Sequence, residues 1–167
     1  LPVTSLALGS IGVTPLEMVN AYAAFASNGW YADPTIIVRV TDSQGNVLLD
    51  NTPQPQLVLD PWATASLTSV LQGVINGGTG KAASIGRPAA GKTGTTDSER
   101  NVWFVGYVPQ LATAVWIGDD SNRALGKGIT GGHYAAPIWR DFMSQALKNE
   151  PVKYFPAASK FPRPARQ

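Results

Sequence analysis

The chain has 167 residues, enough to bury a hydrophobic core and normally to form one domain. Hydrophobic residues make up 44% of the sequence and charged residues 14%, against roughly 25% charged residues in a typical soluble domain. These proportions exclude a disordered chain, and no apolar run in the sequence is long enough to cross a membrane as a helix. The absence of cysteine excludes disulfide bonds, thiolate catalysis and cysteine-bound metals.

The net charge of +2 is unevenly distributed along the chain. Residues 1–150 carry nine basic and eleven acidic side chains, a balance of −2, whereas residues 151–167 carry four basic and no acidic ones, a balance of +4. The positive charge is therefore in a Pro-rich segment and not in the body of the protein. We expect a disordered, solvated tail over 151–167 and no nucleic-acid partner.

The first third of the chain predicts a helix and a hairpin. Thr14-Pro15-Leu16-Glu17 is a capping box with proline at the first helical position, so a helix is expected over Thr14–Ser27. Gly29 is expected to end it in the left-handed conformation. The aliphatic runs Ile36–Val40 and Val47–Leu49 enclose a turn sequence with glycine at the bulge position, which predicts a β-hairpin.

A second helix is expected to begin at Asp60-Pro61 and to end before Gly77, with one apolar stripe formed by Leu67, Val70, Leu71 and Val74. The remaining elements are three strands and a helix: Lys92–Thr96, Val102–Val108, Leu111–Ile117 and Ala136–Leu147. Helices and strands in this order predict an α+β fold with an antiparallel sheet flanked by helices.

Gly86–Thr93 matches the phosphate-loop pattern G-x-x-x-x-G-K-[ST]. Such a loop needs a buried strand before it and a helix that begins at the lysine. The segment after Lys92 is a poor helix former and a fair strand former, and Pro88 lacks a backbone donor. The sequence therefore argues against nucleotide binding.

As a strand, Lys92–Thr96 has a different chemical meaning. Alternation places Lys92, Gly94 and Thr96 on one side and Thr93 and Thr95 on the other. The backbone N–H groups of an edge strand, two hydroxyls and an ammonium group suit a ligand carboxylate and a developing oxyanion. For the triplet Lys-Thr-Gly alone, a plain edge strand with a solvated lysine would be the better interpretation.

The surrounding sequence resembles the transpeptidase domain of class A penicillin-binding proteins. The resemblance covers residues 5–148 and rests on five stretches in the family's order: Leu6–Ser10 continuing through Val13–Met18, Gly78–Ala83, Ala90–Thr96, Val102–Pro109 and Ala135–Trp139. It implies a fold like that of the serine β-lactamases and penicillin-binding proteins, here incomplete. Residues 1–150 would be the C-terminal part of a transpeptidase domain, followed by the tail.

The family's other two motifs, S-x-x-K and S-x-N, are absent from this sequence. The resemblance therefore implies that the serine nucleophile belongs to an N-terminal half outside this chain. It also implies roles for the third motif. Lys92 would assist proton transfer, and the Thr95 backbone N–H would form half of the oxyanion hole. Thr93, Gly94, Thr95 and Thr96 would bind substrate.

The function that this resemblance implies is peptidoglycan D,D-transpeptidation at the extracytoplasmic face of the cell membrane, through an anchor outside this chain. Stem peptides and β-lactams would be the ligands, the N-terminal half of the domain the partner, and no cofactor or metal is implied. Two alternatives remain open: a D,D-carboxypeptidase or β-lactamase of the same fold, and a non-catalytic binding module without the nucleophile.

Other conspicuous residues are interpreted as structural. His133, the single histidine, has no partner at a metal-ligand spacing, so an exposed or structural role is expected. Asp119-Asp120 ends a strand and fits a turn better than a metal site. Ser5 and Ser66 have neither lysine nor histidine near them in sequence and are poor candidates for a nucleophile.

Overall fold

The computed structural model describes residue 9 and residues 11–165 of the chain. Its α-helices are α1 (Pro15–Ala26), α2 (Pro61–Asn76) and α3 (Ala136–Ala146). Its strands are β1 (Trp30–Tyr31), β2 (Arg39–Thr41), β3 (Val47–Asp50), β4 (Gln56–Leu57), β5 (Ala90–Thr95), β6 (Asn101–Val108) and β7 (Leu111–Gly118). Short helical turns complete the list: η2 (Lys81–Ala83), η3 (Asp97–Glu99), η4 (Gly131–Ala135) and η5 (Ala158–Lys160).

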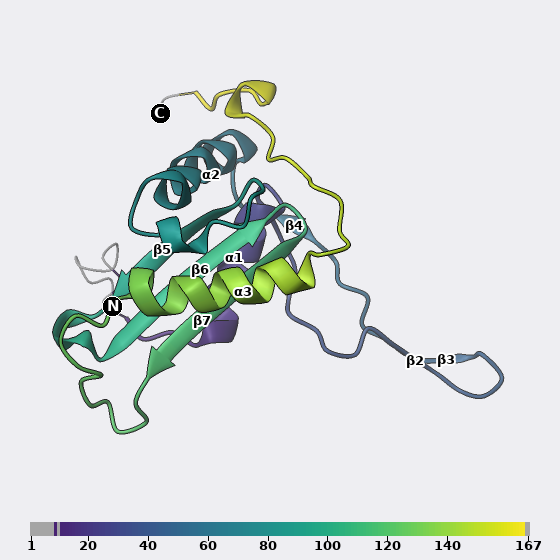
Figure 1. Cartoon of the computed structure of the whole chain (residues 1–167). Helices are drawn as coiled ribbons and strands as arrows, with labels where there is room; N and C mark the ends of the chain where they lie inside the picture. Colours follow the sequence, from purple (N-terminus) through teal and green to yellow (C-terminus); the bar gives the residue numbers. More distant parts are fainter. Residues whose placement is uncertain (1–8, 10, 166–167) are drawn as a thin grey trace.

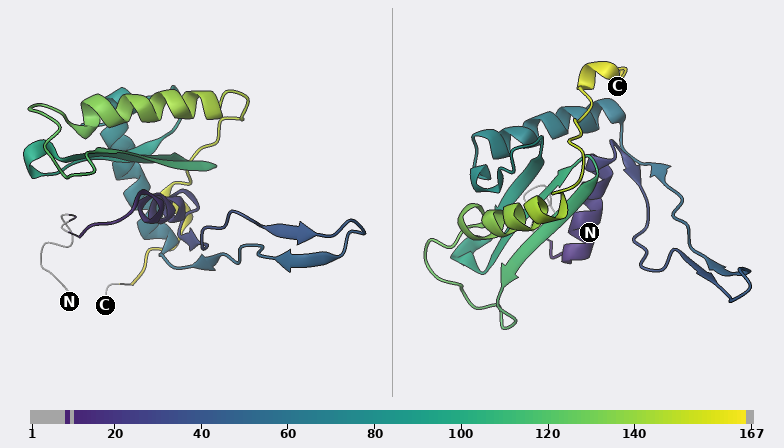
Figure 2. Two further views of the ribbon diagram at one scale, coloured as in Figure 1. Left: turned by 90° about the horizontal axis from the view of Figure 1, so that it is seen from below. Right: turned by 45° about the vertical axis from the view of Figure 1, so that its right-hand side comes forward.

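The central layer is an antiparallel sheet of three strands in the order β5-β6-β7. Helix α3 covers one face of this sheet and α1 lies against the other, while α2 packs beside β5 (Figures 1 and 2). Pairing is continuous: Lys92 lies opposite Val105, and Val108 lies opposite Leu111 across the Pro109-Gln110 turn. The predicted α+β fold with an antiparallel sheet is confirmed.

The position of Lys92 excludes the phosphate-loop interpretation. Lys92 lies inside strand β5 and not at the beginning of a helix, so no helix N-terminus faces a phosphate there. Strand β5 is an edge of the central sheet, since β6 is its strand partner within the described residues. The prediction of an edge strand paired with β6, which in turn pairs with β7, is confirmed.

Most of the core lies between the sheet and α3. Phe104 of β6 and Trp139 of α3 are fully buried, and their ring centroids lie 5.2 Å apart. On the opposite face Tyr107 packs against Tyr22 and Phe25 of α1. Burial of a large apolar side chain contributes about 1.5–3 kcal/mol to stability. These two clusters therefore fix α1 and α3 on opposite sides of β6, the strand that pairs with the one carrying Lys92.

Both long N-terminal helices begin where the sequence predicts. Thr14 and Glu17 form the full capping box of α1, and Asp60 caps α2 by accepting from the Ala63 N–H. Gly29 has the predicted positive φ (102°), but Asn28 (φ 57°) precedes it and takes the first left-handed position after the helix. The Gly29 N–H then bonds back to the Ala24 carbonyl at 2.8 Å, as in a Schellman motif.

The buried face of α2 matches the predicted stripe in part, since Leu71 is buried and Val74 is partly buried. Thr64, Thr68, Leu71 and Ile75 are among its buried residues, whereas Leu67 is 38% and Val70 69% exposed. A hydrogen bond of 2.8 Å between the Thr68 and Tyr107 hydroxyls satisfies the polar group of a threonine on the buried face. Hydrophobicity alone does not reveal such a polar contact.

Strands β2 and β3 form the predicted hairpin, with Gly45 in the left-handed region at its turn. The hairpin and its flanking residues, 35–52, project away from the body as an arm (Figures 1 and 2). Every residue of β2 and β3 is exposed. A two-stranded hairpin without a packed face is marginal in water, so the arm is weakly stabilised by its own contacts.

The disorder expected over 151–167 stays a prediction, and the described residues of this segment lie against the body. Gln110 donates to the Pro151 carbonyl at 2.9 Å, and the Phe155 ring lies 5.4 Å from that of Tyr107. The Arg163 guanidinium lies 5.0 Å above the Trp62 ring of α2. Aromatic and cation–π contacts to the body therefore hold a segment whose charge and proline content suggested a free tail. The domain division at residue 150 stays a prediction.

Candidate functional site

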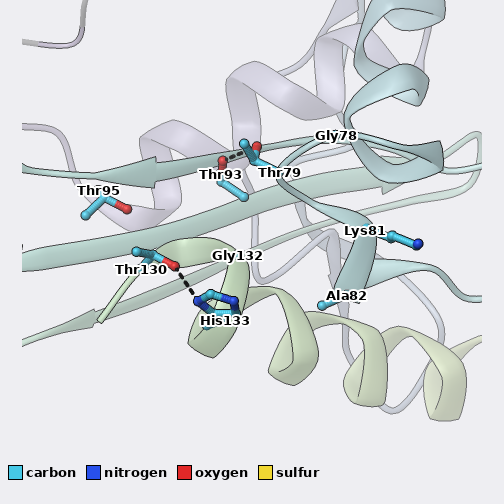
Figure 3. Close-up of a pocket in the computed structure, with 9 residues that line it drawn as sticks. All are labelled: Gly78, Thr79, Lys81, Ala82, Thr93, Thr95, Thr130, Gly132 and His133. Atoms are coloured by element: carbon cyan, nitrogen blue, oxygen red, sulfur yellow. Dashed lines mark hydrogen bonds between the residues drawn. The ribbon is translucent and has the colours of Figure 1, made fainter. Parts of the chain in front are cut away.

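A cavity of about 710 Å3 lies beside strand β5. Its walls come from four segments: the loop that follows α2, η2, β5 and the beginning of η4 with the residue before it (Figure 3). The lining residues are Gly78, Thr79, Lys81, Ala82, Thr93, Thr95, Thr130, Gly132 and His133. Its lining side chains include four threonine hydroxyls and two basic groups, and no carboxylate is among these residues.

Thr93 and Thr95 form the β5 wall of the cavity. They share a face because side chains alternate along a strand, and this face is the one that packs on α3, since Thr93 lies opposite Phe104. The Thr93 and Thr79 hydroxyls are 2.7 Å apart, and the Thr95 hydroxyl accepts from the Gly131 N–H at 3.2 Å. The structure thus brings together the two threonines that the sequence singled out.

Lys92 and Gly94 lie on the other face of β5. Lys92 is opposite Val105 and exposed, and its ammonium donates to the Thr93 carbonyl at 2.9 Å. It does not line the cavity. A side chain on Gly94 would crowd the Trp103 Cβ at 3.1 Å, so glycine allows close strand packing there. The separation of Lys92 from Thr93 and Thr95 is the one that strand alternation predicts.

Thr96 lies beyond the cavity, in the turn between β5 and β6. Its N–H donates to the Asn101 carbonyl at 3.0 Å, and its hydroxyl accepts from the Asn101 N–H at 2.9 Å. The structure therefore does not bring Thr96 together with Thr93 and Thr95. Its predicted contact with substrate stays a prediction, and its observed contacts are those of a turn residue.

The wall opposite β5 is formed by Thr130, Gly132 and His133, which sequence reasoning did not assign to the site. A Cβ on Gly131 would overlap the Trp103 carbonyl oxygen and lie 2.6 Å from that of Gly94, so only glycine fits there. A Cβ on Gly132 would likewise overlap the Thr79 carbonyl oxygen. The Gly131-Gly132 pair was the available signal, because adjacent glycines often mark a close approach of two backbones.

The loop that leads to this wall, residues 119–130, is held by the turn after β5. The Glu99 carboxylate accepts from the Gly128 N–H at 2.8 Å, and Arg100 donates to the Asn122 carbonyl at 2.7 Å. Glu99 adopts φ 52°, a left-handed conformation that is uncommon for a residue with a side chain. The strained residue Glu99 is thus also the one whose carboxylate helps to position the loop before Thr130, Gly132 and His133.

The two aspartates at the end of β7 belong to a turn, as the sequence predicts. Asp119 accepts from the Ser121 N–H at 2.9 Å and pairs with Arg123 at 2.8 Å. The Arg123 guanidinium holds the pKa of the Asp119 carboxyl below its usual range. Over residues 9 and 11–165, no three histidine, aspartate or glutamate side chains lie together as metal ligands would. His133 is exposed.

Comparisons with known proteins identify the family. The penicillin-binding protein transpeptidase domain matches residues 2–144. The chain is 41% identical to penicillin-binding protein 1A of Aquifex aeolicus over 92% of its length, and 42% identical to penicillin-binding protein 2D of Bacillus subtilis over 90%. The PonA1 protein of Mycobacterium tuberculosis, solved in complex with penicillin V, superimposes with a TM-score of 0.81 at 30% identity, over 93% of this chain and 44% of that one.

The chain therefore belongs to the transpeptidase family of penicillin-binding proteins. It corresponds to part of the transpeptidase domain of a class A member, as the resemblance implied. The chain spans about a fifth of the length of these curated relatives, 21% and 23%. Of the stretches that carried the resemblance, Leu6–Leu8 and Ser10 lie outside the described residues. Among the helices that the structure describes, none is both long and apolar enough for a membrane span.

Proposed function

We propose that the protein carrying this chain is a peptidoglycan D,D-transpeptidase. The chain supplies the Lys-Thr-Gly-Thr strand and not the serine nucleophile. The observation that carries the proposal is the arrangement of β5, an edge strand with Thr93 and Thr95 on a cavity that no carboxylate lines. Such an edge offers backbone hydrogen bonds to an extended peptide, and the two hydroxyls suit its terminal carboxylate.

The proposed reaction has two steps. The serine oxygen attacks the carbonyl carbon of the D-Ala-D-Ala bond, the C–N bond breaks, and D-alanine leaves with the proton taken from the serine. An amine of a second stem peptide then attacks the acyl ester, the ester C–O bond breaks, and the serine regains a proton. Each step forms a tetrahedral oxyanion, and the Thr95 N–H is assigned as one of its two donors. Loss of such a donor reduces the rate by about 100- to 1,000-fold.

The faces of β5 suggest how the roles are divided. Thr93 and Thr95 would hold the donor peptide's carboxylate from the α3 side. Lys92, on the α1 side, would stand next to the serine and asparagine of the second motif and assist proton transfer. We therefore infer that the nucleophile reaches the free edge of β5 from the α1 side. Gly94 would let the peptide backbone lie close to the strand, and Thr96 would border the far end.

Several further assignments belong to the same proposal. The ligands are stem peptides and β-lactams, supported by the penicillin V complex of the similar M. tuberculosis protein. The partner is the N-terminal half of the same transpeptidase domain. The location is the extracytoplasmic face of the cell membrane, through an anchor outside this chain. The reaction itself requires no cofactor.

A fluorescent penicillin tests whether the serine lies outside this chain. The chain alone is expected to give no labelled band after denaturing electrophoresis, because no S-x-x-K motif supplies an activated serine. The complete protein is expected to be labelled, and Thr95→Val in it should slow labelling. A covalent adduct on any serine of residues 1–167 would contradict the assignment.

The products formed from a pentapeptide ending in D-Ala-D-Ala, with an added amine acceptor, separate transpeptidation from its alternatives. A transpeptidase gives the aminolysis product by mass spectrometry, whereas a D,D-carboxypeptidase gives only hydrolysis. Rapid hydrolysis of penicillin would indicate a β-lactamase. A complete protein that neither binds penicillin nor processes the peptide would be the non-catalytic module.

A further inference from the structure

The far wall of the cavity carries polar groups that the proposed reaction leaves without a role. Thr130 and His133 face the cavity across from the β5 threonines (Figure 3). The lining contains two ionisable residues, Lys81 and His133, and both are basic. A cavity with hydroxyls and basic groups on two walls, and no acid, is suited to an anionic ligand group.

Local contacts position the His133 ring. The Thr130 hydroxyl and His133 Nδ1 are 3.2 Å apart, and the His133 N–H donates to the Thr130 carbonyl at 3.2 Å. His133 lies in η4, a π-helical turn, a rare conformation that often occurs at functional sites. When Thr130 donates to Nδ1, the ring proton is on Nε2, which has no hydrogen-bond partner within the described residues and can donate to a ligand.

The backbone next to His133 is held against strand β5. Gly131 donates to the Thr95 hydroxyl, and a Cβ on Gly132 would lie 3.8 Å from the Thr93 methyl group. The residue preceding His133 therefore lies beside the same threonine that the proposed function assigns to carboxylate binding.

We propose that His133 is a further binding residue of this site, whose Nε2–H donates to a carboxylate of the acyl donor from the wall opposite Thr93 and Thr95. Thr130 is the positioning residue that holds the ring in the tautomer required. This proposal rests on the proposed function, since it assumes that the cavity holds the acyl donor. It also makes the carboxylate, and not the peptide backbone, the group on which His133 acts.

The test compares penicillin V with its methyl ester in the complete protein, as second-order acylation rate constants. His133→Ala is expected to lower the rate for the acid about tenfold, the effect of one charge-assisted hydrogen bond, and to leave the ester rate unchanged. His133→Gln should restore part of the loss, because its amide can donate from near the Nε2 position. Thr130→Val should give a smaller loss of the same kind.

Tyr134→Ala serves as the matched control, because Tyr134 is the exposed neighbour of His133 and does not line the cavity. Its ratio of acid to ester rates is expected to equal that of the unmodified protein. Thermal unfolding of each variant separates misfolding from a binding defect.

Three outcomes are distinguishable. In His133→Ala, a lower acylation rate constant for penicillin V, with an unchanged one for its methyl ester, supports the proposal. An unchanged ratio in His133→Ala, or an equal loss with acid and ester, overturns it and leaves the transpeptidase assignment intact. An unmodified protein that is acylated by neither compound overturns the proposed function itself.

Discussion

Strand β6 and the arm are made of similar strand-forming residues but have opposite environments. Six of the eight residues of β6 are buried, whereas every residue of β2 and β3 is exposed. Strand β6 has a neighbour on each edge and a helix on each face, while β2 and β3 pair with each other alone. β-Branched and aliphatic residues therefore indicate a strand in both regions, and the layers around it determine how much that strand contributes to stability.

The largest contrast is expected from truncating one buried and one exposed side chain. Trp139→Ala removes a fully buried indole that packs on Phe104 and donates to the Thr113 carbonyl at 3.1 Å. It should lower the free energy of unfolding by about 3–5 kcal/mol. Leu48→Ala in the arm, where the side chain is 67% exposed, should change it by less than about 0.5 kcal/mol. Urea titration followed by circular dichroism measures both.

Two glycine substitutions compare the tightly packed cavity wall with an open position on helix α2. Gly131→Ala forces a methyl group into the carbonyl oxygens of Trp103 and Gly94, which should destabilise the fold by about 1–3 kcal/mol. Gly73→Ala lies in α2 with open space around its Cβ. It should stabilise by about 0.5–1 kcal/mol, because alanine loses less backbone entropy. A tolerated Gly131→Ala would mean that the wall is mobile.

The buried hydrogen bond between Thr68 and Tyr107 allows a double-mutant test of the α2–β6 contact. Thr68→Val leaves the Tyr107 hydroxyl without a partner and should cost about 1–3 kcal/mol. Adding Tyr107→Phe should recover part of this loss, since neither polar group then remains unpaired. Purely additive losses in the double variant would show that the hydroxyls do not interact.

Tyr107 also predicts a pH dependence. Burial raises the pKa of Tyr107 to about 12, against an ordinary value of 10.0. Because the folded state holds this proton more tightly than the unfolded chain, its contribution to stability is complete below pH 10 and is lost as the pH rises toward 12. Urea titrations across this range should show that the free energy of unfolding falls more steeply with pH for the unmodified chain than for Tyr107→Phe. Equal slopes would show that Tyr107 is not the group responsible.

The smallest effect on stability is expected for charges added to the arm, but these should change association. Val40 and Leu49 are cross-strand neighbours, 37% and 42% exposed. Exposed apolar strands promote association, so the chain is expected to self-associate in sedimentation experiments. Val40→Lys with Leu49→Glu should raise the monomer fraction with little change in unfolding free energy. Persistent association would instead indicate the outer edge of β7, which pairs with β6 alone among the described residues.

The sequence by itself determined the local elements and the chemically active strand. Capping residues set the beginnings of α1 and α2, and β-branched runs set β6, β7 and their turn. Alternation along β5 correctly separated Lys92 from Thr93 and Thr95. These features depend on neighbours a few residues apart, which is why a single sequence is enough to predict them.

Only the tertiary structure decided which residues complete the site and which surfaces are covered. His133 reaches the cavity because glycines let its loop pack on β5, a contact between segments about 40 residues apart in sequence. Thr68 is accommodated in the core by its hydrogen bond with Tyr107, and the basic tail lies against the body through the aromatic partners of Phe155 and Arg163. Each of these outcomes depends on a partner distant in sequence, and local periodicity carries no information about such partners.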